Sequence, residues 1–390
     1  MNIDVLETHF VVRWASAVTP DQQESMAQAW RRCLTDKQGS LMWETTHHPF
    51  SMHFTASVFF RSRIPNGGVL HLGSDTFEGL AEAVTSEVTV AAILERAGEL
   101  TMLHACGVAD SDGAVVALVA KSGTGKTTAS SQLARTFGYI TDETVAIRPD
   151  GSVVPYPKPL SVKQTTPGAA KLQVGPDELG LRVAPDNPRI AAIALLDRVS
   201  GGNHQWPVIE PVPLVEAVLA LIPDTSSQAE VVQPLQSLCR LIDSVGGVFR
   251  VSYSEAADLT DSLAPLFLAA SVELPEAGRE WSPAMGAPGA EQPTDPAGAE
   301  PLDSIPAGWL QRTDAVDAVE IGGDLLVLTE TELTRLSGIG PIIWQTAQGP
   351  VSMETLVGRI EALHGLTEGY EALLDAAVDG LVSQGLLLRG

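Results

Sequence analysis

The sequence predicts a large α/β unit followed by a small α+β unit. In the large unit, strands and helices alternate around a glycine-rich turn, "AKSGTGKT", which is typical of phosphate-binding α/β domains. In the small unit, short strands precede helical patterns. Between the two units, Pro, Gly, Ala and acids dominate, which predicts a flexible linker. The expected parts are an N-terminal α+β region at 1–100, a P-loop domain at 101–274, the linker at 275–306 and a C-terminal domain at 307–390.

The elements of the large unit follow from apolar periodicity and turn signals. The expected strands lie at 9–16, 52–62, 101–109, 114–120, 139–147, 191–197 and 246–254. The strands at 101–109 and 114–120 should form a hairpin around the turn "DSDG". The expected helices lie at 86–100, 127–138, 234–243 and 257–270.

The glycine-rich turn follows the Walker A pattern from Ala120 to Thr127, with Ala in place of the first Gly. Its glycines let the backbone wrap around an anion, and the helix that follows adds the positive end of its dipole. Lys126 can reach the β- and γ-phosphates of ATP, and Thr127 can ligate Mg²⁺. The alternative is a glycine-rich turn that binds nothing. The residues expected to hold the nucleotide are Ser122, Gly123, Thr124, Gly125, Lys126, Thr127 and Thr128.

Two adjacent acids, Asp142 and Glu143, interrupt the apolar run "YITDETVAI" after the predicted P-loop helix. In P-loop proteins an acid at a strand end holds Mg²⁺ or its water, and we assign Asp142 to the metal together with Thr127. A second carboxylate can take the proton from a substrate hydroxyl. The sequence leaves open which acid is the base, and an exposed strand-end pair is the alternative. His104, on the strand before the turn, is a further candidate, with a core histidine as its alternative.

The run from Leu103 to Val145 resembles the catalytic core of the HPr serine kinase/phosphorylase family and its kinase-only relatives. A strand with a histidine, a P-loop and a strand with two acids occur in the same order, with Glu143 where the family usually has Asp. A weaker resemblance extends from Leu100 to Ala270. It implies an ATP- and Mg²⁺-dependent kinase of HPr-kinase fold, with homo-oligomers by analogy. The catalytic residues that it implies are His104, Lys126, Asp142 and Glu143.

Two further features concern this resemblance. The stretch "VVPYPKPLSVK" is similar to the P-x-P-x-x-L-x-x-K stretch of the kinase-only relatives. It makes Lys163 a candidate phosphate contact, with a surface lysine as the alternative. The Glu and Arg-Gly motif of the bifunctional enzymes is not found in the sequence. Phosphorylase activity is therefore not expected, and the second Mg²⁺ ligand stays unassigned.

The C-terminal unit has short strands around Gly322 and helical stretches at 340–348, 352–365 and 368–385. Strands followed by helices favour a winged-helix domain, and Ser352 is a suitable N-cap for the middle helix. This unit contains few basic residues and many acidic ones, which argues against DNA binding. The run "ELTRLSGIGPIIWQTAQGPVSMETLVGRI" resembles the PqqD family. Such domains recognise the leader of ribosomally made precursor peptides, including those of lasso peptides.

The PqqD resemblance implies that an extended peptide adds to a strand edge near 331–337, with the last helix as a wall. A core position is the alternative for each candidate groove residue. Glu330, Glu332 and Glu368 could attract a basic leader, with solvated surface as the alternative. The candidate peptide-binding residues are Leu333, Leu336, Leu373 and Val378.

Composition restricts the partners and the compartment. A formal net charge of −24 argues against nucleic acid, leaves room for a basic peptide and otherwise serves solubility. The cysteines, Cys33, Cys106 and Cys239, are far apart and predict neither a zinc site nor a disulfide framework. The N-terminus does not follow the signal-peptide pattern, and no apolar run reaches the length of a membrane span. We therefore expect a cytoplasmic protein.

Together these features favour an ATP-dependent kinase that phosphorylates a hydroxyl, expected to be a serine, on a ribosomally synthesised precursor peptide. The C-terminal domain would capture the leader of this peptide, and the linker would raise the effective concentration of the acceptor. One alternative is a nucleotide-binding regulator or peptide-delivery protein without phosphotransfer. Another is a serine kinase that acts on a carrier protein.

Overall fold

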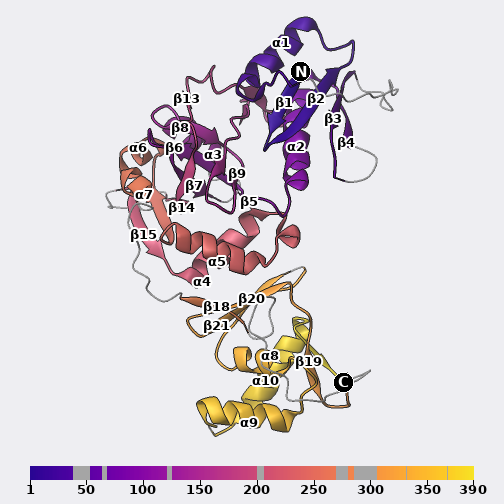
Figure 1. The fold of residues 1–390 in the computed structure, drawn as a ribbon, viewed down its shortest axis with the longest axis vertical. Coiled ribbons are helices and arrows are strands. Elements are labelled where there is room, and N and C mark those ends of the chain that lie inside the picture. Colours follow the sequence, from indigo (N-terminus) through magenta and orange to yellow (C-terminus); the bar gives the residue numbers. More distant parts are fainter. Residues whose placement is uncertain are drawn as a thin grey trace. The chain divides into compact units, whose positions relative to one another are not determined.

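The computed structural model describes residues 1–37, 53–63, 68–120, 125–199, 206–268, 280–284, 305–330, 332–366 and 368–390. The chain divides into two compact units (Figure 1). The segments that make up the first unit are Met1–Val212, Pro223–Val231 and Leu241–Leu274. Those of the second unit are Pro213–Ile222, Val232–Arg240 and Pro275–Gly390. Two short segments that the sequence groups with the P-loop domain therefore belong to the second unit.

The first unit begins with an antiparallel sheet of strand order β1-β2-β3-β4. Helix α2 packs on it and buries Leu80, Val84 and Val88, which recur at helical spacing. This helix begins nine residues earlier than the sequence predicts, because Thr76 caps it by accepting from the N–H of Gly79. The elements are β1 (Asn2–Val5), β2 (Thr8–Trp14), α1 (Pro20–Ala29), η1 (Arg31–Cys33), β3 (Phe54–Phe60), β4 (Gly68–Ser74) and α2 (Phe77–Glu95).

The central sheet of the first unit has the strand order β13-β8-β6-β7-β14-β17-β15. The predicted hairpin is confirmed, because β6 pairs with β7 in antiparallel register, Ala105 opposite Val119. Strands β7, β14 and β17 run parallel to one another, and β8 runs antiparallel to β6. The strands are β6 (Ala105–Ala109), β7 (Ala114–Val119), β8 (Gly138–Thr141), β13 (Arg182–Val183), β14 (Arg189–Arg198), β15 (Val208–Val212) and β17 (Val248–Tyr253).

Two apolar runs that the sequence predicts as single strands are each divided between two sheets. The run 101–109 forms β5 and β6 with a break at His104, and the run 139–147 divides at the acid pair. The first part of the run 101–109, β5, and the last part of the run 139–147, β9, join a smaller sheet of order β10-β9-β5-β16. Its strands are β5 (Thr101–Leu103), β9 (Val145–Ile147), β10 (Val153–Val154) and β16 (Thr225–Ser226). The breaks place polar side chains where the chain leaves the central sheet.

Short elements complete the first unit. The P-loop helix α3 packs against β6 and near the closing helices, which replace the single helix expected at 257–270. The elements are α3 (Lys126–Leu133), the hairpin β11 (Leu160–Val162) and β12 (Leu172–Val174), η3 (Gln228–Glu230), η4 (Ala256–Asp258), α6 (Leu259–Ser262) and α7 (Ala264–Leu268). Helix α5 (Pro234–Ser244) forms where a helix is predicted, and its residues 234–240 belong to the second unit.

The second unit contains a sheet of order β18-β20-β21-β22, in which β22 is an edge strand. Strand β18 (Trp281–Pro283) lies inside the predicted linker, so this part of it has regular structure. Ser352 caps α9 as expected, accepting from the N–H of Thr355 at 3.2 Å. The remaining elements are α4 (Leu214–Leu221), η2 (Ile222–Asp224), β19 (Leu310–Arg312), β20 (Asp317–Ile321), β21 (Asp324–Leu328), β22 (Leu333–Leu336), α8 (Gly340–Thr346), α9 (Met353–His364), α10 (Tyr370–Ser383) and β23 (Leu387–Arg389).

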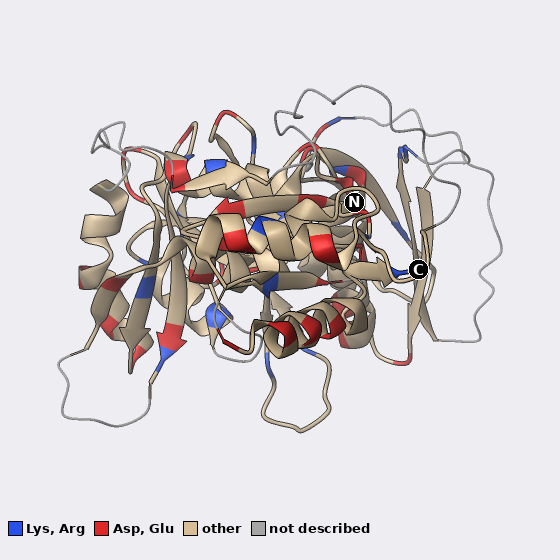
Figure 2. Ribbon diagram, turned by 90° about the horizontal axis from the view of Figure 1, so that it is seen from below, with Lys and Arg blue, Asp and Glu red and all other residues tan. Residues whose placement is uncertain are grey.

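Acidic residues are spread over many helices and strands of the ribbon, with basic residues among them (Figure 2). The cysteines are all free and buried. Among the described residues, no helix combines the length and apolar character that crossing a bilayer requires.

Candidate functional site

The four predicted catalytic residues, His104, Lys126, Asp142 and Glu143, lie together where strands of the central sheet begin or end. Strands β7 and β8 both run antiparallel to β6, which lies between them. The carboxyl ends of β7 and β8 therefore share an edge with the amino end of β6. His104 precedes β6, the P-loop follows β7 and the acid pair follows β8. This edge is where α/β sheets usually bind their ligands.

The P-loop leads directly into α3. Gly125 precedes this helix with φ of 101°, a backbone conformation that glycine adopts without strain. Lys126 begins the helix and donates to the backbone carbonyl of His104 at 3.3 Å. Thr127 is half-buried, and Thr128 is exposed. Three predicted nucleotide contacts, Ser122, Gly123 and Thr124, lie outside the described residues.

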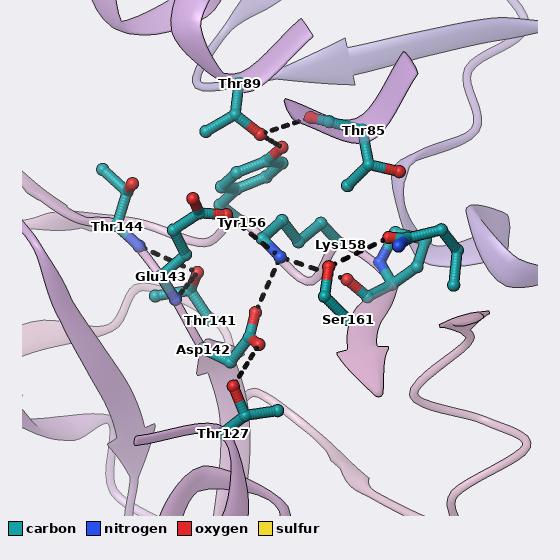
Figure 3. A network of polar contacts seen from close by, with 12 residues as sticks. Thr85, Thr89, Thr127, Thr141, Asp142, Glu143, Thr144, Tyr156, Lys158 and Ser161 are labelled. Carbon is teal, nitrogen blue, oxygen red and sulfur yellow. Dashed lines mark hydrogen bonds and ion pairs between the residues drawn. The ribbon is translucent and has the colours of Figure 1, made fainter. Parts of the chain in front are cut away.

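The acid pair is joined to a buried lysine. Lys158 places its Nζ 2.9 Å from Oδ1 of Asp142 and 3.1 Å from Oε2 of Glu143 (Figure 3). On the other side, the hydroxyl of Thr127 donates to Oδ2 of Asp142 at 3.4 Å. Lys158 is 1% exposed and Asp142 5% exposed, whereas the side chain of Glu143 is 37% exposed. The two acids therefore differ sharply in their access to solvent.

Two tyrosines pack around this ion pair. The hydroxyl of Tyr139 lies 3.3 Å from Oδ1 of Asp142 and 3.3 Å from the carbonyl of Lys158. The hydroxyl of Tyr156 shares a 2.7 Å hydrogen bond with Thr89 on α2. Burial raises the pKa of both phenols well above the ordinary value, with the charge of Asp142 adding to the shift for Tyr139. Both side chains are therefore neutral and act as supports for the charged groups.

The basic groups of the site have shifted pKa values. Burial lowers the pKa of Lys126, and the acids around it oppose this shift. Burial also lowers the pKa of His104, and the positive charge of Lys126 adds to the effect. His104 is therefore neutral near pH 7. For Lys158, burial lowers the pKa, but the negative charges of Asp142 and Glu143 outweigh it, so the net shift is upward.

Sequence reasoning missed Lys158. The stretch 153–163 indicated Lys163, which is exposed directly after β11. The structure instead places Lys158 on the acid pair, with its Nζ also donating to the carbonyl of Pro159 at 3.2 Å. The available signal was chemical: two adjacent acids after a buried strand need a nearby cation, and this lysine stands between two prolines in a buried stretch.

The residues present fit Mg²⁺. Oγ1 of Thr127 and Oδ2 of Asp142 are adjacent oxygen atoms of the kind that Mg²⁺ prefers, and this ion commonly uses one or two carboxylates plus substrate phosphates. Within the described ranges, no cluster of three or more His, Cys, Asp and Glu side chains could hold a metal. Phosphate oxygens and water would complete the coordination, and the second protein ligand stays unassigned.

In the second unit, the predicted peptide-binding residues fall into two groups. Leu336 and Val378 are buried in the hydrophobic core. Leu333 lies half-buried on the edge strand β22, and Leu373 is 62% exposed on α10. Leu373 lines a cavity of about 250 Å³. Its other lining residues are Gly338, Ile339, Val357, Ile360, His364, Gly365, Leu366, Tyr370 and Leu374.

Comparisons with known proteins give little beyond this geometry. No protein-family model matches the chain, and no curated protein matches its sequence. One solved structure with detectable similarity is the HPr(Ser) kinase/phosphatase from Coxiella burnetii, at 11% identity and a TM-score of 0.22. The match covers 42% of this chain and 92% of that one. A similarity this low says nothing about the chemistry of this chain.

Proposed function

We propose that the protein is an ATP-dependent kinase that phosphorylates a serine hydroxyl of a ribosomally synthesised precursor peptide, of the kind matured into lasso peptides. The observation that carries this proposal is the meeting of Lys126, Thr127, Asp142 and Glu143 at one sheet edge. A phosphate loop supplies binding, and adjacent carboxylates supply proton acceptance. Both functions are needed for transfer to a hydroxyl.

In the proposed reaction, the hydroxyl oxygen of the peptide attacks the γ-phosphorus of ATP. A new O–P bond forms, the bond from the γ-phosphorus to the β,γ-bridging oxygen breaks, and ADP leaves with the electron pair. A carboxylate of the acid pair accepts the hydroxyl proton. Lys126 stabilises the charge on the transferring phosphoryl group. Mg²⁺, held by Thr127 and Asp142 with the phosphates, would neutralise phosphate charge when bound.

The second unit offers features suited to an extended peptide. Strand β22 is an edge strand, so its outer main-chain groups can pair with an added strand. The cavity beside Leu373 can take an apolar side chain of the same peptide. The formal charge of −24 suits a basic leader. We assign this unit the capture of the leader, and the first unit the chemistry.

The first test replaces the P-loop lysine. We expect Lys126→Ala to reduce phosphate transfer at least about 100-fold, because this side chain stabilises charge that develops in the transition state. The measurement is mass spectrometry after incubation with Mg·ATP, and the peptides tested are the products of short open reading frames that neighbour this gene. Lys171→Ala, a surface lysine paired with Glu82, is the matched control and should keep full activity. Retained transfer by Lys126→Ala would overturn the proposal.

The second test concerns peptide capture. Leu373→Asp should weaken binding of the same peptide about tenfold or more, because it places a charge in an apolar cavity without a partner. Calorimetry with the wild-type and variant proteins measures this directly. Leu363→Asp, on α9 at a similarly exposed position, is the control and should bind normally. Equal affinity of Leu373→Asp and wild type would remove this cavity from the binding site.

A second candidate is a nucleotide-binding regulator that delivers the peptide without transferring phosphate. Its specific support is that Lys158 neutralises charge on the acid pair, which would weaken a general base. The same mass spectrometry separates the two functions. A gain of one phosphate on the peptide supports the kinase, whereas ATP binding without a phosphorylated product supports the regulator. A serine kinase that acts on a carrier protein would bind ATP but leave this peptide unmodified.

A further inference from the structure

The ammonium of Lys158 occupies a complete cation site. Its three N–H donors match three oxygen acceptors: Asp142 at 2.9 Å, Glu143 at 3.1 Å and the carbonyl of Pro159 at 3.2 Å. The side chain is almost fully enclosed. Tyr139 and Tyr156 pack nearby with neutral phenols. The slot formed by these three oxygen atoms therefore suits a small cation that can donate hydrogen bonds.

Burying an ammonium group costs more free energy than burying an apolar side chain of similar size. A charge removed from water is tolerated only when its partners compensate for the lost hydration, and an apolar side chain would often serve stability as well. A lysine at this position is therefore better explained by what its charge does to the acids than by packing. Its Nζ contacts both carboxylates at once (Figure 3).

The contacts of Lys158 make the two acids unequal. Asp142 has both oxygens engaged, Oδ1 by Lys158 and Tyr139 and Oδ2 by the hydroxyl of Thr127. Glu143 contacts Lys158 through Oε2, and its side chain remains 37% exposed. Asp142 is thus fixed beside the P-loop helix, and Glu143 is the acid that an incoming hydroxyl can reach.

We propose that Lys158 is a positioning residue that fixes Asp142 beside Thr127 and holds Glu143 at the open side of the site, so that Glu143 receives the proton of the attacking hydroxyl. This inference rests on the proposed kinase function and deepens it. The hydroxyl oxygen forms its bond to the γ-phosphorus, ADP departs with the electrons of the broken bond, and the proton moves to Glu143. Lys158 touches neither substrate and acts through the two carboxylates.

Chemical rescue tests this role. Lys158→Ala empties the cation site, so phosphate transfer to the precursor peptide should fall about 100-fold in kcat. KM for ATP should change less than about threefold, because the hydroxyls of Thr127 and Tyr139 still hold Asp142. Methylammonium, a small cation with N–H donors, should restore at least about tenfold of the lost kcat. It should also raise the melting temperature of Lys158→Ala, because it binds only the folded variant. Neither effect should occur in the wild type.

Matched variants make the outcome decisive. Tetramethylammonium has charge but no N–H donor and should not rescue, and Lys171→Ala should respond to neither ion. Lys158→Gln keeps hydrogen-bond donors without the charge. It should fold and show the same loss of kcat, which covers the case in which Lys158→Ala does not fold. Asp142→Asn should weaken binding of Mg·ATP, whereas Glu143→Gln should lower kcat and leave that binding intact.

Failure of the proposed function and failure of the proposed role of Lys158 give different results. A wild-type protein that transfers no phosphate overturns the proposed function. If the wild type is active, a folded Lys158→Gln with kcat within about threefold of wild type overturns the role of Lys158. A melting temperature of Lys158→Ala that methylammonium does not change shows that the slot is not a cation site, and this also overturns the inference.

Discussion

The two units contain buried carboxylates, Asp142 and Asp317, whose charge is compensated in different ways. Asp142, in the first unit, is 5% exposed and faces the ammonium of Lys158. Asp317, in the second unit, is fully buried and accepts from neutral donors, among them the backbone N–H of Gln236 at 3.0 Å, its side-chain amide at 2.8 Å and the N–H of Ala318 at 2.9 Å. One acid is compensated by charge, and the other by amide dipoles.

This difference indicates what each acid does. Neutral donors around Asp317 satisfy its oxygens and tie the start of β20 to the first turn of α5, which is a structural task. A charged partner at Asp142 maintains a carboxylate next to α3, where the proposed function needs a charged group. Burial alone therefore does not mark a functional acid. What distinguishes Asp142 from Asp317 is a charged partner.

Removing the charged partner should have the larger effect on stability. Lys158→Met should lower the free energy of unfolding by about 3–5 kcal/mol at pH 7, because it leaves Asp142 as a buried charge whose remaining side-chain partners, Thr127 and Tyr139, are neutral hydroxyls. Glu143 should add little, since its side chain is partly exposed. Urea unfolding followed by circular dichroism measures the change.

The pH dependence of this effect has a defined sign. The pKa of Lys158 in the folded protein is raised above the ordinary value of 10.5. Its stabilising contribution is therefore complete below pH 10.5 and is lost as the pH rises through the folded value. The difference between the wild type and Lys158→Met should narrow in that alkaline range. A gap that widens there would contradict a charge-based role for Lys158.

The sequence predicts much of the scaffold, because the information is local. The hairpin of β6 and β7, the strand and helix on either side of the P-loop, and the helices α8, α9 and α10 each follow from periodicity or capping within one segment. The pairing of β18 with β20 is not local. Trp281 is an isolated apolar residue in a proline-rich stretch, and only its partner strand reveals it as part of a sheet.

The candidate site could be predicted in part. Lys126, Thr127 and the acid pair carry recognisable spacing. The breaks at His104 and the acid pair do not show in the sequence, because the residues on both sides are apolar and buried in either sheet. The break at His104 is fixed by a partner far along the chain, since its N–H donates to the carbonyl of Asp224. Lys158 was missed for the same reason: its slot is made by residues from another part of the chain.

The smaller effect on stability should come from removing Asp317, whose hydrogen-bond donors are neutral. Asp317→Ala should lower the free energy of unfolding by about 1–3 kcal/mol, because it removes the carboxylate that accepts from the backbone N–H and side-chain amide of Gln236. Burial raises the pKa of Asp317 above 3.8, against the opposing hydrogen bonds from Gln236. The folded state thus binds the carboxyl proton of Asp317 more tightly than the unfolded state does. The contribution of Asp317 to the free energy of unfolding is therefore greatest below pH 3.8, and it decreases as the pH rises through the folded pKa. The cost of Asp317→Ala should accordingly shrink with rising pH, measured against the exposed control Asp314→Ala. A cost that grows instead would mean that Asp317, like Asp142, depends on a cation.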